Sequence, residues 1–203
     1  MSGLLLVISG PSGAGKGTVC RALREKMPYL NYSVSVTTRP PRPGEKEGEN
    51  YFFLDRDEFL TLLKEGAFLE WAEVYGNLYG TPRRPVEEAL ARGEDIILEI
   101  DTQGAAQIKK HYPEGVFVFL IPPTFKELED RIKKRGTETP TGMATRLGWA
   151  EKELEQLDLY DYVVVNDRVD EAVAKLEAII TAEKCRTKRF KTTWQWLFWR
   201  KEG

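Results

Sequence analysis

The stretch "ISGPSGAGKGT", Ile8 to Thr18, decides how the fold begins. It completes the continuous apolar run "LLLVIS" (4–9), which is typical of a strand buried on both faces of a parallel sheet. It leads into "TVCRALREKM" (18–27), in which apolar residues recur at helical spacing. A glycine-rich turn between such a strand and helix aims backbone N–H groups and the positive end of the helix dipole at one point. The stretch therefore predicts a phosphate-binding loop.

The loop satisfies the pattern G-x-x-x-x-G-K through Gly10, Gly15 and Lys16. Lys16 is expected to carry a full positive charge toward the β and γ phosphates of a nucleotide. An ordinary glycine-rich turn with a chance lysine is the alternative, and the flanking strand and helix argue against it. Gly17 follows Lys16, so the hydroxyl that commonly ligates Mg²⁺ is displaced to Thr18. This GKGT form is similar to that of nucleoside monophosphate kinases.

The same alternation of strand and helix continues along the chain. A parallel α/β sheet with helices on both faces is therefore the predicted fold class. Buried strands are predicted at 95–100, 116–121 and 162–166, and helices at 102–110, 124–134 and 169–184.

Two segments interrupt this alternation and suggest insertions into the sheet core. Residues 36–87 hold short strand-like pieces and turn residues, which predicts an inserted lobe. Residues 135–160 begin with the polar turn "RGTETPTG" and continue as a charged helix, which predicts a mobile lid. The core then comprises 1–35, 88–134 and 161–184. The loop alone fits a GTPase, an ATPase motor or a small-molecule kinase, and two insertions in 203 residues favour the kinase.

Composition places the chain among globular proteins of one domain, with 41% apolar and 31% charged residues. No window approaches the length of an apolar membrane span, and no signal peptide is expected before the first strand. Cys20 and Cys185 suggest neither a disulfide framework nor a metal site, so we expect a cytoplasmic protein. The single histidine, His111, is expected at a helix end on the surface.

The net charge of −2 is unevenly distributed. Residues 184–203 hold seven Lys or Arg and one acid, and subtracting these from the totals of 30 and 32 leaves a net charge of −8 for 1–183. The body is therefore not expected to bind nucleic acid. The tail 185–203 is basic and holds three of the five tryptophans. Docking on its own domain or on a partner subunit is favoured over a membrane surface, because the segment is short and carries no lipid anchor.

The inserted segment holds groups suited to a phosphorylated acceptor. Arg39 and Arg42 flank two prolines, and two guanidinium groups in a stiff loop suit a phosphate dianion. A solvated basic turn is the alternative. Further on, Glu70 follows an apolar run, and its carboxylate can accept hydrogen bonds from the N1–H and N2–H groups of guanine. Taken alone, Glu70 also fits an ordinary acid at a strand end.

Taken together, these residues resemble guanylate kinase, which phosphorylates GMP with ATP. The matching blocks occur in order over about residues 4–184. They are "GPSGAGKGT", "SVSVTTRPPRPGE", "YFF", "FLEWAEVYGNLYGTP", "EIDTQGA", "RGTET" and "VVVND". The resemblance implies a guanylate kinase-like domain at 1–184 with a GMP-binding lobe at 36–87 and a lid at 135–160.

The resemblance also implies roles for individual residues. ATP contacts are implied for Gly10, Pro11, Ser12, Gly13, Ala14, Gly15, Lys16, Gly17, Thr18 and Asn166. GMP contacts are implied for Ser35, Arg39, Arg42, Tyr51, Glu70, Tyr79, Thr81 and Asp101. The residues implied to act on the transferred phosphoryl group are Lys16, Arg39, Arg131, Arg135 and Arg146.

The predicted cofactor is Mg²⁺, held through ATP phosphates and water rather than by a cage of protein ligands. Glu99 and Asp101 share a face at the end of a buried strand and can organise water around the ion, although Glu99 can equally pair with an arginine. In the lid, Pro140 suits a helix start but Gly142 weakens the first turns, which leaves lid order open.

Two alternatives remain, one of another functional class and one a kinase of similar fold. One is a non-catalytic scaffold that binds phosphorylated peptides, and the intact glycines and Lys16 argue against it. The other is a kinase of a base-free acceptor such as a ribose bisphosphate, and Glu70 and Asp101 argue against that. ATP and GMP are the predicted partners, and the chain is expected to be a monomer or a homo-oligomer.

Overall fold

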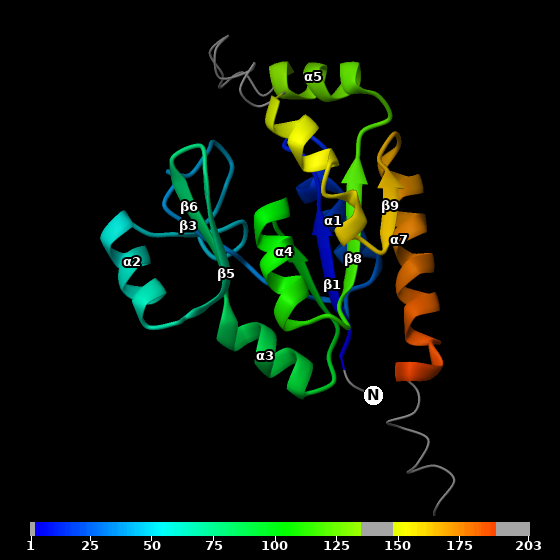
Figure 1. The fold of residues 1–203 in the computed structure, drawn as a ribbon, viewed down its shortest axis with the longest axis horizontal. Coiled ribbons are helices and arrows are strands. Elements are labelled where there is room, and N and C mark those ends of the chain that lie inside the picture. Colours follow the sequence, from blue (N-terminus) through cyan, green and yellow to red (C-terminus); the bar gives the residue numbers. More distant parts are fainter. Residues whose placement is uncertain (1–2, 135–147, 190–203) are drawn as a thin grey trace, which may run out of the picture.

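The structure is a computed structural model that describes residues 3–134 and 148–189. Its centre is a five-stranded sheet in the order β2-β7-β1-β8-β9, and every neighbouring pair is parallel (Figure 1). The bounds are β1 Leu5–Ser9, β2 Asn31–Tyr32, β7 Ile96–Glu99, β8 Val116–Ile121 and β9 Tyr162–Val165. The predicted fold class is confirmed.

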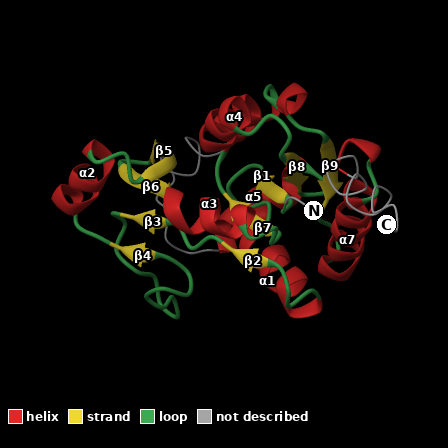
Figure 2. Ribbon diagram, turned by 90° about the horizontal axis from the view of Figure 1, so that it is seen from below, coloured by secondary structure: helices red, strands yellow, loops and turns green. Residues whose placement is uncertain are grey.

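Helices cover both faces of this sheet because its strands are apolar on both sides (Figure 2). Leu6 and Ile8 of β1 pack with α1 and α7, whereas Leu5 and Val7 pack with α3 and α4. The bounds are α1 Lys16–Lys26, α3 Arg83–Ala91, α4 Thr102–His111, α5 Phe125–Lys134 and α7 Val169–Lys184.

The predicted strands and helices are confirmed to within a few residues, with two differences. The first helix begins at Lys16, two residues before the predicted start, because Gly15 in the left-handed region caps it. The edge strand β2 was not predicted, since two residues carry no detectable periodicity. The exposed His111 ends α4 as expected.

A second, four-stranded sheet lies beside the core in the order β4-β3-β6-β5. It falls within the range predicted as an inserted lobe, although the lobe's limits stay a prediction. Its helix α2 starts with a capping box between Asp55 and Glu58. The bounds are β3 Val36–Thr37, β4 Phe52–Phe53, α2 Arg56–Lys64, β5 Phe68–Val74 and β6 Asn77–Pro82.

The predicted lid falls partly outside the described residues. Pro140 and Gly142 lie outside the described residues, and the described part continues with a helix at 148–154 and a 3₁₀ turn at Leu157–Leu159. The helix at 148–154 lies close to the carboxyl ends of the central strands (Figure 1).

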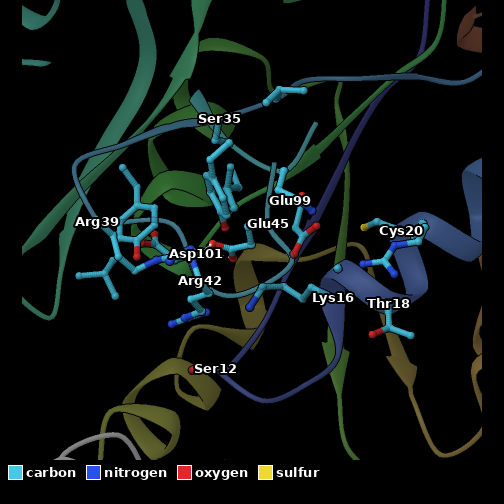
Figure 3. A pocket seen from close by; sticks show the side chains of 18 of the residues that line it. Ser12, Lys16, Thr18, Cys20, Ser35, Arg39, Arg42, Glu45, Glu99 and Asp101 are labelled. Carbon is cyan, nitrogen blue, oxygen red and sulfur yellow. Dashed lines mark hydrogen bonds and ion pairs between the residues drawn. The ribbon is translucent and has the colours of Figure 1, made fainter. Parts of the chain in front are cut away.

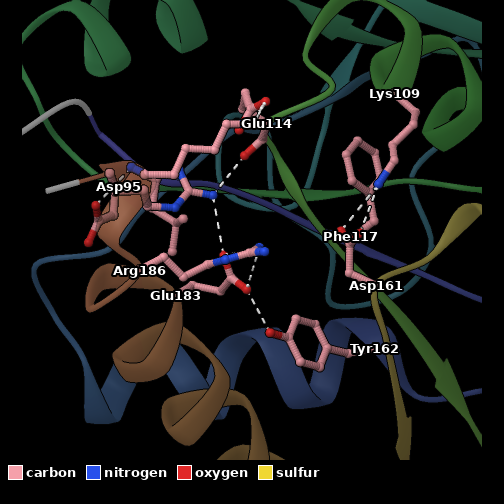
Figure 4. Close-up of polar contacts among 11 residues, drawn as sticks. Asp95, Lys109, Glu114, Phe117, Asp161, Tyr162, Glu183 and Arg186 are labelled. Atoms are coloured by element: carbon pink, nitrogen blue, oxygen red, sulfur yellow. Dashed lines mark hydrogen bonds and ion pairs between the residues drawn. The ribbon is translucent and has the colours of Figure 1, made fainter. Parts of the chain in front are cut away.

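The start of the basic tail is bound to the core (Figure 4). Glu183 of α7 is 2% exposed and accepts hydrogen bonds from the Tyr162 hydroxyl at 2.6 Å and from Arg186 at 3.2 Å. Arg189 donates to the backbone oxygen of Glu114 at 2.7 Å. Residues 190–203 lie outside the described part, so docking of the tail beyond Arg189 stays a prediction. Among the described residues, no helix is long and apolar enough to cross a membrane.

Candidate active site

A cavity of about 840 Å³ joins the phosphate loop to the second sheet (Figure 3). Lys16, Arg39 and Arg42 all point into it. The predicted residues that line it are Ser12, Gly13, Gly15, Lys16, Gly17, Thr18, Ser35, Arg39, Arg42, Tyr51, Glu70, Tyr79, Glu99 and Asp101. Residues far apart in the sequence thus converge on one space.

The shape of the phosphate loop depends on its glycines. Gly10 and Gly15 have backbone φ values of 136° and 88°, which residues other than glycine rarely adopt. A Cβ at Gly10 would lie 2.1 Å from the backbone oxygen of Leu120. A Cβ at Gly15 would lie 2.5 Å from Nδ2 of Asn166. The turn and its close packing on β8 and β9 therefore both require glycine.

Lys16 is held by the loop itself. Its Nζ donates to the backbone oxygens of Gly10 at 2.6 Å and Pro11 at 3.2 Å. Neutral carbonyl groups fix the position of the ammonium group but do not cancel its charge. A positive charge therefore faces the cavity at the start of α1, where the helix dipole adds to it.

On the opposite wall, Glu45 holds the two arginines in place. Its carboxylate accepts from the Arg39 guanidinium at 2.9 Å and from the Arg42 backbone N–H at 2.7 Å. The Arg39 guanidinium also lies over the Tyr51 ring, 5.4 Å from its centroid. Because Glu45 uses only the backbone of Arg42, it leaves that side chain directed at the cavity.

Glu70 is a buried carboxylate next to a second acid. It is 5% exposed, and one oxygen accepts the Thr81 hydroxyl at 2.6 Å. Burial, aided by the charge of Asp101, raises the pKa of Glu70 to about 7. Asp101 caps α4 by accepting the Gly104 N–H at 2.8 Å, and burial also raises its pKa. Two carboxyl groups, both acceptors of hydrogen bonds, thus line the same cavity and interact electrostatically.

Comparison with known proteins decides the family. A model described as guanylate kinase matches residues 2–183. Guanylate kinases of Carboxydothermus hydrogenoformans and Desulfitobacterium hafniense are 54% and 55% identical, each over 92% of this chain, covering 92% and 94% of those proteins. The crystal structure of guanylate kinase from Anaplasma phagocytophilum aligns with a TM-score of 0.77 at 38% identity, covering 93% of this chain and 89% of that one.

The chain belongs to the guanylate kinase family. Its α/β core is accordingly that of a nucleoside monophosphate kinase, as the resemblance implied.

Six predicted residues do not line the cavity, namely Gly10, Pro11, Ala14, Thr81, Arg131 and Asn166. Thr81 is fully buried and reaches the site only through Glu70. Asn166 Nδ2 donates to the backbone oxygen of Ala14 at 2.8 Å, and the Arg131 guanidinium donates to the backbone oxygen of Asn166 at 3.0 Å. These two residues brace the phosphate loop from behind. Arg135 and Arg146 lie outside the described residues.

Glu99 lines the cavity beside the start of α1. It accepts a hydrogen bond from the Tyr32 hydroxyl at 3.0 Å, a contact that the sequence did not suggest. A Cβ on Gly17 would lie 3.4 Å from Glu99 Oε1, so glycine at this position leaves room for the carboxylate beside the loop.

Two site residues were missed from the sequence. Glu45 belongs to the quoted block "RPPRPGE", where its carboxylate was a detectable partner for the arginines. Glu153 lies in the helix at 148–154, yet it lines the cavity and accepts a hydrogen bond from the Ser12 backbone. Burial raises the pKa of Glu153 to about 7, against the opposing effect of Lys16. No spacing in the sequence indicates that this acid reaches the phosphate loop.

Proposed function

We propose that this chain transfers the γ-phosphoryl group of ATP to GMP and so releases ADP and GDP. Membership of the guanylate kinase family supports the reaction. The observation that carries the proposal is the single cavity that holds the phosphate loop on one wall and Arg39, Arg42 and Glu70 on the other. A donor phosphate and an acceptor phosphate can therefore meet without leaving the protein.

ATP is proposed to bind with its phosphates in the loop from Gly10 to Thr18. The positive φ values of Gly10, Gly13 and Gly15 support this role, because turns of this kind direct backbone N–H groups at an anion. Asn166, which braces the loop, is proposed to lie beside the adenine base. Arg131, Arg135 and Arg146 are proposed to contact the transferred group as the lid closes, and closure would exclude the water that competes with GMP.

GMP is proposed to bind by its phosphate to Arg39, Arg42, Ser35, Tyr51 and Tyr79. Guanidinium groups and hydroxyl donors together suit a phosphate dianion. The base is proposed to bind to Glu70, Thr81 and Asp101, because the Thr81 hydroxyl donates to Glu70 and the charge of Asp101 acts on the same carboxyl group. Guanine presents two adjacent donors to a carboxylate, whereas a base-free acceptor would leave that carboxylate buried and unused.

Transfer itself requires alignment and positive charge more than covalent chemistry. Lys16 is proposed to stabilise the charge that develops on the γ-phosphoryl oxygens, and Arg39 to stabilise the same group from the GMP side. Glu45 supports this role of Arg39 because it fixes the guanidinium group before substrate arrives.

Guanylate kinases generally use ATP together with Mg²⁺. The donor set fits a water-rich Mg²⁺ site, since the Thr18 hydroxyl, Glu99 and Asp101 all line the cavity. Within the described ranges, no three or more His, Cys, Asp or Glu residues form a group that could hold a metal ion. When bound, Mg²⁺ would neutralise charge on the β and γ phosphates. Glu99 and Asp101 would orient its water ligands.

A cytoplasmic location and a role in purine nucleotide metabolism, through GMP recycling, are part of the same proposal. The substrates ATP and GMP support both, and so do the two free cysteines. Monomer and homo-oligomer both remain predictions.

The experiment is an assay of ADP release from ATP and Mg²⁺ with GMP, AMP, CMP, dTMP or no acceptor. We expect turnover with GMP to exceed turnover with the other acceptors by at least about 100-fold, because only guanine satisfies the buried carboxylate. Absence of turnover with GMP would overturn the proposal. A preference for AMP would mean that the base contacts are wrongly assigned.

A further inference from the structure

Helix α4 lies between the two sheets and contacts strand β5, the edge strand of the second sheet (Figure 1). This contact brings together an acid at the start of α4 and an acid of β5. Asp101 is the N-cap of α4, and Glu70 belongs to β5. The spacing between these two base-contacting acids is therefore set by how β5 is held against α4.

Gln107 of α4 holds the backbone of β5 at the residue after Glu70. Its Nε2 donates to the Trp71 oxygen at 2.7 Å, and its Oε1 accepts from the Trp71 N–H at 3.3 Å. The side chain thus pairs with both backbone groups of one residue, as a neighbouring strand would. Such a bidentate contact fixes the position of β5 along α4 and perpendicular to it.

Gly104, also in α4, provides the space in which the carboxylate of Glu70 lies. A Cβ on Gly104 would lie 2.3 Å from Glu70 Oε2 and 2.8 Å from its Cδ, which is closer than atoms approach. The N–H of the same glycine donates to Asp101. Thr81 holds the other oxygen of Glu70 at 2.6 Å. The carboxylate is therefore enclosed between Thr81 and a surface of α4 that lacks a side chain.

We propose that Gly104 and Gln107 are positioning residues that set the selectivity of this enzyme for guanine. They contact neither substrate in this proposal, and they act by holding Glu70 at a fixed distance from Asp101. The inference rests on the proposed GMP site and goes beyond it, because it assigns base selectivity to the helix that supports the acids.

The chemical basis is the geometry that guanine requires. Its N1–H and N2–H donors reach one carboxylate only if both oxygens lie near the plane of the base. Hypoxanthine, the base of IMP, keeps N1–H but lacks the 2-amino group. A displaced Glu70 therefore loses more binding energy with GMP than with IMP. The ratio of kcat/KM for GMP to that for IMP reports the position of Glu70.

The main test is Gly104→Ala. Alanine favours a helix more than glycine does, which should offset part of the strain that the new methyl group creates at Glu70. The new methyl group should displace Glu70, and we expect the GMP-to-IMP ratio to fall about tenfold or more while KM for ATP stays unchanged. A lower GMP-to-IMP ratio with an unchanged KM for ATP is an outcome that a purely structural role would not produce.

Ala106→Gly is the matched control on the same helix. It should weaken α4 without changing the neighbours of Glu70, and so leave selectivity intact. An equal loss of selectivity in Ala106→Gly would overturn the proposal, since helix stability would then explain the effect. An unchanged ratio in Gly104→Ala would also overturn it.

Gln107→Ala supplies a second test that does not depend on the glycine. Alone, it should lower the GMP-to-IMP ratio several-fold. Combined with Glu70→Gln, it should add almost nothing, because the group that it positions is already altered. Additive effects in this double-mutant cycle would contradict the proposal. Wild-type protein is assayed alongside, so a failure of the proposed function appears as absent GMP turnover and is distinct from either result.

Discussion

The phosphate loop and the acceptor wall bind the same chemical group in opposite ways. The loop is one continuous stretch, and its shape comes from backbone conformations that glycine permits. The acceptor wall is assembled from side chains of separate elements, and its arginines are held by the carboxylate of Glu45. The loop should therefore fail only at its glycines and Lys16, whereas the acceptor wall should change in graded steps at many positions.

Lys16→Met tests the loop and should give the largest effect. It removes the one full charge that the loop directs at the cavity, and we expect kcat to fall at least about 10³-fold. Affinity for GMP, measured by isothermal titration, should stay within about twofold of wild type, because GMP is held by the other wall. The control is Lys26→Met. Lys26 is a surface lysine on the same helix as Lys16, and it pairs with Glu177 of α7. A loss of kcat below tenfold would contradict the role of Lys16.

Arg42→Met tests the acceptor wall. Its side chain points into the cavity while Glu45 holds its backbone, so the variant should lose a phosphate contact and keep the loop. Charge-assisted hydrogen bonds contribute about 1.5–3 kcal/mol, which corresponds to a roughly 10- to 100-fold weaker Kd for GMP. Unaltered GMP affinity would remove the role. Arg56→Met, an exposed arginine of α2, is the matched control.

A third prediction concerns pH and separates base recognition from phosphate recognition. The pKa of Glu70 is raised to about 7, so the free site is protonated below that value and ionised above it. Guanine donates to the ionised form, and GMP affinity should fall up to about tenfold per pH unit below 7. Glu70→Gln should bind GMP more weakly and lose this dependence, while keeping the pH dependence that belongs to the phosphate of GMP. If GMP affinity depends on pH equally in the wild-type protein and in Glu70→Gln, the prediction is wrong.

The raised pKa of Glu70 also predicts how the stability of the folded protein depends on pH, and Glu70→Gln tests this too. Because the folded state holds the proton more tightly than the unfolded state, stability is greatest below the ordinary pKa of 4.5 and falls as pH rises toward 7. Glu70→Gln should therefore raise the melting temperature of the ligand-free protein at about pH 8 and leave it nearly unchanged at about pH 4.

The contrast between the two walls also explains what could be predicted from the sequence. The loop between a buried strand and a helix could be predicted because Gly10, Gly15 and Lys16 lie within seven consecutive residues, and the core followed from apolar runs such as 116–121. Arg39, Arg42 and Glu70 required the family resemblance, since their convergence depends on long-range pairing of β3, β5 and β6. Local patterns do not encode that pairing.

The missed contacts share one physical cause. Glu153 reaches Ser12, and Gln107 reaches Trp71, across large sequence separations and between different elements. From the sequence alone, a charged residue in a charged helix, such as Glu153, is expected to lie on a solvent-exposed face. Arg131 and Asn166 show the opposite case. The resemblance implied that they contact ATP or the transferred group, and in the structure their hydrogen bonds also support the phosphate loop from behind.

Glu153→Gln should give the smallest effect, and it tests whether the loop is as independent of side chains as its glycines suggest. In the ligand-free protein, the carboxylate of Glu153 accepts from the Ser12 backbone and lies near Lys16, where ATP phosphates are proposed to bind. At about pH 8 it is ionised and opposes the incoming negative charge. Neutral glutamine should therefore lower KM for ATP by about two- to fivefold, as expected for a partly exposed charge pair.

The advantage of Glu153→Gln should disappear at about pH 6, because the wild-type carboxyl group, whose pKa is about 7, is then mostly protonated as well. Glu151→Gln, an exposed acid in the same helix, should have no effect at either pH and controls for net charge. A higher KM for ATP in Glu153→Gln would mean that the carboxylate assists the loop rather than competing with phosphate. In that case the phosphate grip would depend on a side chain from beyond the loop, and the distinction between the two walls would be one of degree.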